Sequence, residues 1–390
     1  MITNMKNYIS RKMLNYQGLT FDDVLLYPDY CDFKRDDIKL DTYLTKKIKL
    51  KIPFISSPMD TVTESDMAIA LGKLGGIGII HRNLTVDDQV KEIIKVKKQQ
   101  IIVGAAIGSG PGFEKRVDAL VKNNIDVIVV DSAHGYTKSI IDTVKIIRNK
   151  YPQLQIIAGN VATYKGALAL IKAGVDGLRV GMGPGAICTT RIISGMGIPQ
   201  ISALFETCAI AQKYKVPVIS DGGVKYSGDM IKALAAGAST IMMGSIFASC
   251  QESPGEIYEL NSTQIPSRFR NILKKDQDIY LFKSYRGMGS IAAMKKGAEI
   301  KSENEFHGKS YKDRVLVAEG VEGMVPIKGQ VKDIITQAIG GIKSGMYYLG
   351  AKTIKDLHDK AKFLKISQSS LKESHPHDIF VTNPGENYQF

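Results

Sequence analysis

The sequence predicts an α/β protein whose parallel strands close into a barrel, the (β/α)8 or TIM-barrel fold. Short runs of β-branched residues alternate with longer amphipathic segments, a pattern typical of strands joined by crossover helices. Eight such runs precede residue 250, and polar or glycine residues follow many of them, as at the mouth of a barrel. A doubly wound open sheet usually has fewer strands and a glycine-rich turn after the first, whereas the first strand here ends in Ser56-Ser57-Pro58-Met59-Asp60.

The predicted elements follow one another in a regular order. The strands are residues 52–57, 77–81, 103–108, 127–131, 155–159, 177–181, 216–221 and 240–244. Apolar residues recur every three or four positions between them, which predicts helices over residues 64–74, 86–98, 113–123, 139–149, 164–173, 203–214 and 227–236.

The chain beyond the eighth strand is more polar. Residues 249–284 and 295–317 are expected to be long loops, the second a mobile flap. Residues 330–364 again have the apolar period of a helix, and 372–390 form an irregular C-terminal extension. Residues 1–390 are therefore interpreted as one barrel domain.

The composition limits the class of protein. Hydrophobic residues make up 44% of the chain, enough for a large core. We expect no membrane span, because no apolar run reaches about 18 residues, and residues 1–14 lack the apolar centre of a secretory signal. Four scattered cysteines without a CxxC pair disfavour a zinc site or disulfide framework, so we expect a reducing, cytoplasmic location.

The net charge of +13 is compatible with nucleic-acid binding. The lysine clusters are short, however, and no aromatic residues interleave with them as a stacking platform would require. We expect instead a positive field that attracts anionic small-molecule substrates.

A glycine-rich loop with a cysteine follows the sixth predicted strand. Gly181, Gly183 and Gly185 allow the backbone to approach a ligand closely, and Cys188 lies at the far end of the loop. Loop amides and the nearby Arg191 could hold its sulfur as a nucleophilic thiolate. A buried, inert thiol is the alternative.

Two further loops predict an anion site. Asp221-Gly222-Gly223 follows the seventh predicted strand, and Gly244-Ser245 follows the eighth. In this fold these two loops usually bind phosphate through backbone amides and a helix N-terminus. Asp221 would repel a phosphate beside it but can accept hydrogen bonds from ribose hydroxyls. These two loops together therefore suit a 5′-nucleotide.

Seven motifs occur in order along the chain. They are LTFDDVLL (19–26), SSPMDTVTE (56–64), GGIGIIHRN (75–83), DSAHG (131–135), GMGPGAICTTR (181–191), YRGMGS (285–290) and ESHPHD (373–378). Together they resemble the IMP dehydrogenase/GMP reductase family, and more closely its IMP dehydrogenases. The resemblance runs from about residue 18 to about residue 380.

The resemblance implies a catalytic barrel with a two-stage reaction. Cys188 would attack C2 of IMP, and hydride would pass from that carbon to NAD. Hydrolysis of the covalent thioimidate would release XMP for guanine nucleotide biosynthesis. In place of the arginine that activates water in the family, Thr190 and Glu319 could relay the proton of the attacking water. By the same resemblance, IMP would be bound by Ser57, Asp221, Gly223, Gly244, Ser245, Tyr285, Met288, Gly289 and Glu319.

The resemblance also implies a cofactor, an ion and a homotetramer. NAD would lie against Asp131, Ser132, Asn160, Arg179, Gly181 and Tyr348, the tyrosine stacking on the adenine across a subunit interface. A monovalent cation, normally potassium, would be bound by Gly183, Gly185 and Cys188, together with Glu373, Ser374 and His375 from a neighbouring subunit.

Three departures from the family pattern carry expectations of their own. Residues 90–100 run almost directly into residues 103–108, so we expect no CBS modules there and no adenine-nucleotide regulation through them. Ala186 replaces a phosphate-binding serine, which removes a hydrogen bond worth roughly 1.5–3 kcal/mol. In the flap, Glu305 and Phe306 stand where an Arg-Tyr pair would activate water.

Two other interpretations stay open. GMP reductase deaminates GMP with NADPH and needs no Arg-Tyr pair, but the motifs at 56–64, 285–290 and 373–378 favour the dehydrogenase. A hydrolysis-impaired paralogue that binds nucleotide is supported by Glu305 alone. Because a carboxylate repels hydroxide, we expect a burst of NADH followed by slow turnover.

Overall fold

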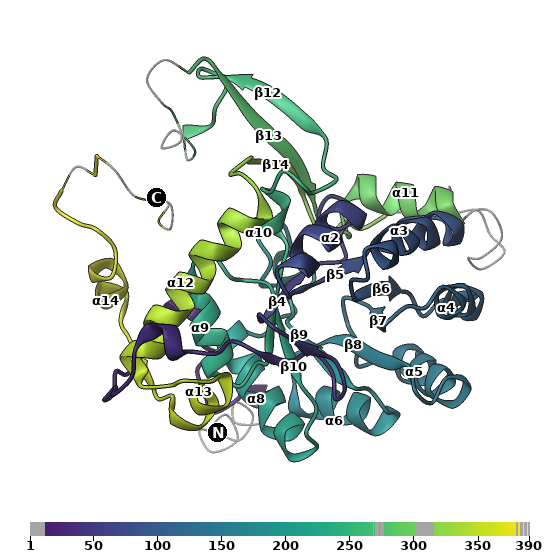
Figure 1. The fold of residues 1–390 in the computed structure, drawn as a ribbon, viewed down its shortest axis with the longest axis horizontal. Coiled ribbons are helices and arrows are strands. Elements are labelled where there is room, and N and C mark those ends of the chain that lie inside the picture. The colour runs from purple at the N-terminus through teal and green to yellow at the C-terminus, as the bar shows by residue number, and fades with distance from the viewer. Residues whose placement is uncertain are drawn as a thin grey trace, which may run out of the picture.

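The computed structural model describes residues 12–267, 269, 273, 277–301, 316–379, 381–382, 385 and 388. Its centre is a closed barrel of parallel strands (Figure 1). The barrel strands are β4 Phe54–Ser56, β5 Ile77–Ile80, β6 Val103–Ile107, β7 Val127–Asp131, β8 Gln155–Val161, β9 Gly177–Val180, β10 Val218–Asp221 and β11 Thr240–Met243. Each pairs with the next, and β11 pairs with β4. The predicted fold class and all eight predicted strands are confirmed.

Helices surround the barrel and cover its outer face (Figure 1). The seven predicted helices are confirmed within a few residues as α2 Ser65–Lys73, α3 Val86–Lys98, α4 Phe113–Lys122, α5 Lys138–Lys150, α6 Tyr164–Ala173, α8 Gln200–Lys213 and α9 Ser227–Ala235. Threonine side chains begin several of them: Thr85 accepts from the amide of Asp88 and Thr163 from that of Gly166, which satisfies helix N–H groups that have no partner within the helix.

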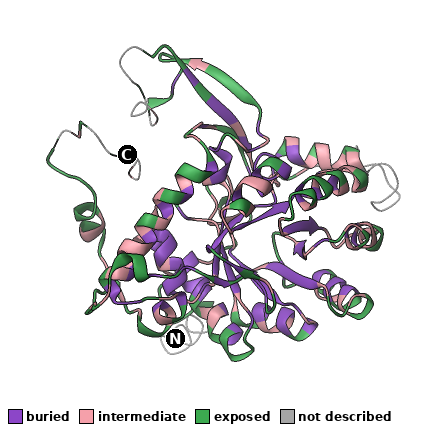
Figure 2. Ribbon diagram, viewed as in Figure 1, coloured by how far each residue is buried: buried purple, intermediate pink, exposed green. Residues whose placement is uncertain are grey.

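The strands are buried on both faces, as expected for a parallel sheet covered by helices. Figure 2 shows this as buried strands at the centre and exposed surfaces on the outer helices. Ile79, Val129, Ile157, Ile219 and Met242 belong to one apolar cluster of strand residues, and each is fully buried. This packed centre holds the carboxyl ends of the strands in fixed positions.

The prediction of a long loop over residues 249–284 is wrong. This region contributes β12 Ile257–Asn261 and β13 Ile279–Arg286, which with β14 Glu322–Pro326 form an antiparallel sheet that projects from the barrel (Figure 1). Alternate β13 residues Tyr280 and Phe282 pack into a small core. The exposed positions Ile279 and Leu281 are also apolar, so the sequence shows no alternation of apolar and polar residues here.

The prediction of a second long loop, over residues 295–317, is also partly wrong. Helix α11 Ile291–Lys301 occupies its first residues. Glu305 and Phe306, on which the expectation of impaired hydrolysis rests, lie outside the described residues.

The remaining elements lie in the connections around the barrel and towards the two ends of the chain. Where the family resemblance places CBS modules, α3 and β6 are joined by residues 99–102. No helix of the described chain is long and apolar enough to cross a membrane. The other elements are η1 Phe21–Asp23, β1 Val24–Leu26, η2 Arg35–Asp37, β2 Thr42–Tyr43, β3 Lys49–Leu50, α7 Thr190–Ile193, α10 Ser245–Ala248, α12 Val331–Leu349, α13 Ile354–Lys360, β15 Phe363–Lys365 and α14 Gln368–Glu373.

Candidate active site

Side chains from four neighbouring strands meet at the barrel mouth. Arg179 of β9 donates from Nε to Asp221 Oδ2 at 2.9 Å and forms an ion pair with Asp131 at the end of β7. Asn160 of β8 donates from Nδ2 to the same Asp221 oxygen at 2.7 Å. Four residues predicted to bind IMP or NAD therefore form one hydrogen-bonded group.

This group is charged at neutral pH. Burial acts to raise the pKa of Asp131, but Arg179 and Arg82 outweigh it and hold that pKa below its usual range. Burial acts to lower the pKa of Arg179, but Asp221 and Asp131 outweigh it and raise that pKa. Arg82, which donates to Asp131 at 3.4 Å, completes the cluster. The mouth thus carries fixed, paired charges that a polar ligand can contact.

A cavity of about 530 Å³ opens between the loops that follow β9, β10 and β11. The residues from these loops and from β13 that line it include Gly185, Ala186, Gly223, Gly244, Ser245 and Tyr285. The structure therefore brings together the glycine and serine loops in which the sequence predicts a phosphate site.

Two glycines of the cavity are needed for its shape. Gly223 has a φ of +80°, a conformation that other residues rarely adopt. A Cβ atom at Gly244 would lie 2.6 Å from Tyr285 Oη, so only glycine allows the hydroxyl to approach so closely. Burial, with a contribution from Asp221, raises the pKa of Tyr285, and the phenol remains protonated as a hydrogen-bond donor.

The cysteine of the glycine-rich loop is partly exposed, which contradicts the alternative of a buried, inert thiol. Cys188 Sγ lies 3.2 Å from the hydroxyl of Thr190, the first residue of α7. The backbone N–H of Cys188 donates to the carbonyl of Gly185, a residue of the cavity wall, at 3.1 Å. The sulfur is thus held on a loop that borders the cavity.

The segment containing Glu319 lies against this loop. The Thr189 amide donates to the Glu319 carbonyl at 3.0 Å, and Gly320 pairs with Cys188. The Glu319 amide in turn donates to the carbonyl of Gly289, next to Met288, at 3.1 Å. The three predicted catalytic positions and the predicted base-contacting turn are therefore neighbours.

Arg191, which was expected to favour the thiolate, also makes hydrogen bonds within the loop. Its guanidinium donates to the carbonyls of Met182 and Ile198, at 3.1 and 2.8 Å. Burial lowers the pKa of Arg191, and nearby Cys188 acts in the opposite direction. Arg191 therefore fixes the shape of the loop, while the polar group in contact with the sulfur is the Thr190 hydroxyl.

Four other predicted residues belong to the backbone framework of the mouth. The buried Ser57 donates its amide to the carbonyl of Met243 at 3.1 Å. The Ser132 amide donates to Gly159 and the Gly181 amide to Val161, at 3.1 and 3.0 Å. Gly183, in the cysteine loop, has a φ of +76°.

Two groups of residues predicted to act from a neighbouring subunit lie on α12 and at the end of α14. Tyr348 of α12 is 58% exposed, and the Arg35 guanidinium lies 5.7 Å from its ring. Glu373, Ser374 and His375 lie at the end of α14, where the His375 ring is 6.5 Å from that of Tyr226, a residue that lines the cavity.

Sequence reasoning missed several residues of the site. Lys225 and Lys328 line the cavity, and Arg82 contacts Asp131. Lys225 follows Gly223 within the same loop, and Arg82 belongs to the third motif, so both carried a local signal. Lys328 follows β14, and only the fold brings it to this wall.

A TIM barrel with a thiol beside glycine-rich anion loops has the architecture of a nucleotide-binding barrel enzyme. Residues 18–377 match the family described as IMP dehydrogenase / GMP reductase domain, and the chain belongs to this family. It is 44% identical to inosine-5′-monophosphate dehydrogenase of Borreliella burgdorferi over 93% of this chain and 98% of that protein. It is 40% identical to the protein of that name from Cryptosporidium parvum, over 95% of this chain and 98% of that protein. The predicted family is confirmed.

Proposed function

We propose that this protein oxidises IMP to XMP with NAD through a covalent bond to Cys188. The observation that carries the proposal is the position of this partly exposed thiol on the loop that also forms a wall of the anion cavity. The names of the relatives support the same reaction.

The first stage joins substrate to enzyme. The Cys188 thiolate adds to C2 of IMP and forms a C–S bond, and the hydride on C2 then leaves with its electron pair. NAD, when bound, supplies the hydride acceptor and becomes NADH. Tyr285, Gly223, Gly244 and Ser245 bind the phosphate, and their convergence on one cavity supports this role.

The second stage releases the product. Water adds to C2, its proton passes to the Thr190 hydroxyl and Glu319, and the C–S bond breaks to return the thiolate and XMP. The short distance of 3.2 Å between Cys188 Sγ and Thr190 Oγ1 supports this role of the hydroxyl. Met288 and Gly289 contact the base from the turn that borders Glu319.

The residues at the mouth fit NAD. The Asp131 carboxylate is 15% exposed, kept ionised by two arginines, and able to accept hydrogen bonds from sugar hydroxyls. Asn160, Arg179, Ser132 and Gly181 surround this position. Tyr348 would reach a nicotinamide cofactor only from a second copy of the chain, and its exposed ring is compatible with such an interface.

We extend the proposal to a potassium ion and a cytoplasmic homotetramer. Gly183, Gly185 and Cys188 offer backbone carbonyls, which suit an alkali cation. Glu373, Ser374 and His375 would complete the ion site from a neighbouring subunit. Equilibrium sedimentation tests this assembly: four chains per particle are expected, and a monomer active at the same concentration would contradict it.

A product assay tests the reaction directly. The full chain is incubated with IMP and NAD in one reaction and with GMP and NADPH in another, and nucleotides are separated by chromatography. We expect XMP and NADH from the first and no IMP from the second. Conversion of GMP to IMP with consumption of NADPH would assign the other activity of the family.

A further inference from the structure

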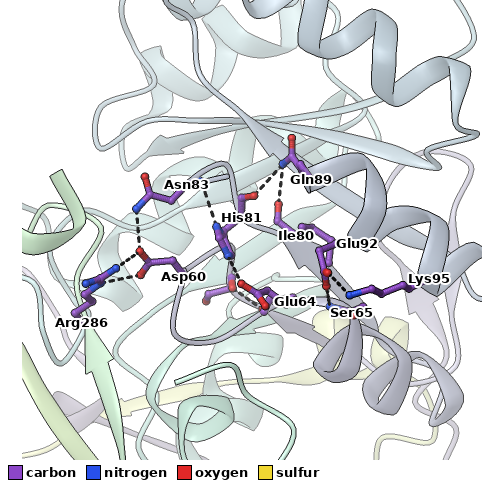
Figure 3. A network of polar contacts seen from close by, with 12 residues as sticks. Asp60, Glu64, Ser65, Ile80, His81, Asn83, Gln89, Glu92, Lys95 and Arg286 are labelled. Carbon is purple, nitrogen blue, oxygen red and sulfur yellow. Dashed lines mark hydrogen bonds and ion pairs between the residues drawn. The ribbon is translucent and has the colours of Figure 1, made fainter. Parts of the chain in front are cut away.

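Asp60 and Arg286 form an ion pair where the projecting sheet joins the barrel. Asp60 follows β4, and its side chain has 0% exposure. Arg286, the last residue of β13, donates from Nε to Asp60 Oδ1 at 3.1 Å and from Nη2 to Oδ2 at 2.5 Å (Figure 3). Two parallel hydrogen bonds fix the orientation of both side chains as well as their distance.

Asn83 binds the same carboxylate from the next barrel loop. Its Nδ2 donates to Asp60 Oδ2 at 2.8 Å (Figure 3). The same nitrogen donates to the carbonyl of Ala293 in α11 at 3.2 Å. Loops after two neighbouring barrel strands therefore hold the segment that runs from Arg286 into α11.

The anchor is itself rigid. The backbone N–H of Asn83 donates to Nδ1 of the fully buried His81 at 3.1 Å (Figure 3). The other ring nitrogen of His81, Nε2, lies 3.1 Å from Oε1 of Glu64. Gln89 of α3 donates to the His81 carbonyl at 3.0 Å. The carboxylate is thus held by side chains that have their own fixed partners.

The Asp60 carboxylate is charged at neutral pH. Burial acts to raise its pKa, but hydrogen bonds from Arg286 and Asn83 and the arginine charge outweigh burial and hold the pKa below its usual range. Removing one partner of such a pair leaves a poorly solvated charge, which costs more than the pair itself contributes.

The residues on either side of Arg286 are those proposed to bind IMP. Tyr285 precedes it and places its hydroxyl against Gly244 in the cavity. Gly289 follows three positions later, and its carbonyl accepts from the Glu319 amide at 3.1 Å. The position of Arg286 therefore sets the position of both a phosphate-side and a base-side contact.

We propose that Asp60 is a positioning residue for IMP binding, which acts through Arg286 on Tyr285 and on the Met288–Gly289 turn. Asp60 makes no contact with the nucleotide in this account. The inference rests on the proposed function and adds to it a determinant of substrate affinity outside the cavity.

Asp60→Asn tests the inference with little change in size. The amide loses the charge that holds Arg286, so we expect the Kd of IMP, measured by calorimetry on the full chain without NAD, to rise roughly ten- to hundredfold. The KM for IMP should rise by a similar factor, with a smaller change in kcat.

Asp126→Asn is the matched control. Asp126 directly precedes β7, at the end of the barrel opposite the mouth. It forms an ion pair with Lys97 at 2.9 Å and accepts a hydrogen bond from the Val103 amide at 2.8 Å. This variant should lose thermal stability and bind IMP with unchanged Kd.

Two further variants separate positioning from stability. Arg286→Lys keeps the charge but loses the paired hydrogen bonds, and we expect a Kd between those of wild type and Asp60→Asn. The double variant Asp60→Asn, Arg286→Gln removes the unpaired charge and should bind IMP more tightly than Asp60→Asn alone.

The outcomes distinguish a failure of the inference about Asp60 from a failure of the proposed function. If Asp60→Asn and Arg286→Lys bind IMP like wild type while their melting temperatures fall like that of Asp126→Asn, the inference is wrong and the proposed function stands. If Asp60→Asn does not fold, Arg286→Lys alone decides in the same way. If the wild-type chain does not bind IMP, the proposed function fails and the inference falls with it.

Discussion

Cys188 at the barrel mouth has neighbours that are close to it in the sequence and neighbours that are distant from it. The sequence identifies Cys188 and Thr190 two positions apart, and their side chains are in contact. The sequence does not show that the carbonyl of Glu319 accepts a hydrogen bond from the amide of Thr189, because that contact joins distant segments of the chain. Nor does the sequence show that Arg191, expected to favour the thiolate by its charge, also donates hydrogen bonds to two backbone carbonyls.

Cys188→Ser should lower NADH formation from IMP by about 10³-fold or more, because a serine hydroxyl is not ionised at neutral pH. Stopped-flow absorbance of NADH measures this, including the first turnover. IMP should still bind, since the cavity wall is unchanged, and calorimetry provides that control. XMP formation at the wild-type rate would overturn the covalent mechanism.

Ala186→Ser should strengthen IMP binding. Ala186 lines the cavity, and a hydroxyl there would add a charge-assisted hydrogen bond to phosphate worth roughly 1.5–3 kcal/mol, a factor of about ten to a hundred in Kd. Ala186→Val, which adds volume without a donor, is the control. A serine variant that binds no more tightly than wild type would show that the phosphate does not reach this wall.

Secondary-structure elements were predictable where the apolar period is strong. The barrel strands are continuous apolar runs and their helices have one apolar face, so both were located within a few residues. The sheet of β12, β13 and β14 was missed because its core is small and centred on Tyr280, Phe282 and Ile265. Its third strand also comes from a distant segment, and a pairing of that kind leaves no local signal.

The polar segment after α11 carries a kinetic prediction. If Glu305 stands in place of a water-activating arginine, mixing the enzyme with IMP and NAD should give a burst of about one NADH per site and then slow turnover. Glu305→Arg should raise the steady-state rate, whereas Glu303→Arg, with the same change of charge nearby, should not. Rapid turnover without a burst, unaffected by Glu305→Arg, would refute this prediction.

The order of the strands in the barrel is the property of the whole molecule that assembles the site. Asp131, Asn160, Arg179 and Asp221 come from β7, β8, β9 and β10, and their hydrogen bonds form because these consecutive strands are neighbours in the sheet. The fold class alone therefore predicted that these residues meet. The contributions of Tyr348 and of residues 373–375 depend on a second subunit and stay predictions.

The stability of the whole fold should decrease in alkali. Burial, with a contribution from Glu252, raises the pKa of the Cys250 thiol. An unfolded thiol ionises near pH 8.5 while the native one keeps its proton, so the free energy of unfolding should fall above about pH 8.5, by up to about 1.4 kcal/mol per pH unit for this group.

Urea unfolding of wild type and Cys250→Ala between pH 7 and pH 10 measures this effect. Because the variant also loses packing, the slopes against pH are compared rather than the stabilities at one pH. A shallower slope is expected for Cys250→Ala, and equal slopes would contradict the assignment.

The central claim is that a purine nucleotide occupies the cavity with its C2 carbon against Cys188. The most direct measurement is acid quenching of the enzyme during turnover of IMP with NAD, followed by peptide mass spectrometry. The account predicts a purine nucleotide attached to the peptide that contains Cys188, and an unmodified Cys208 peptide. NADH production with Cys188 unmodified at every quench time would contradict it.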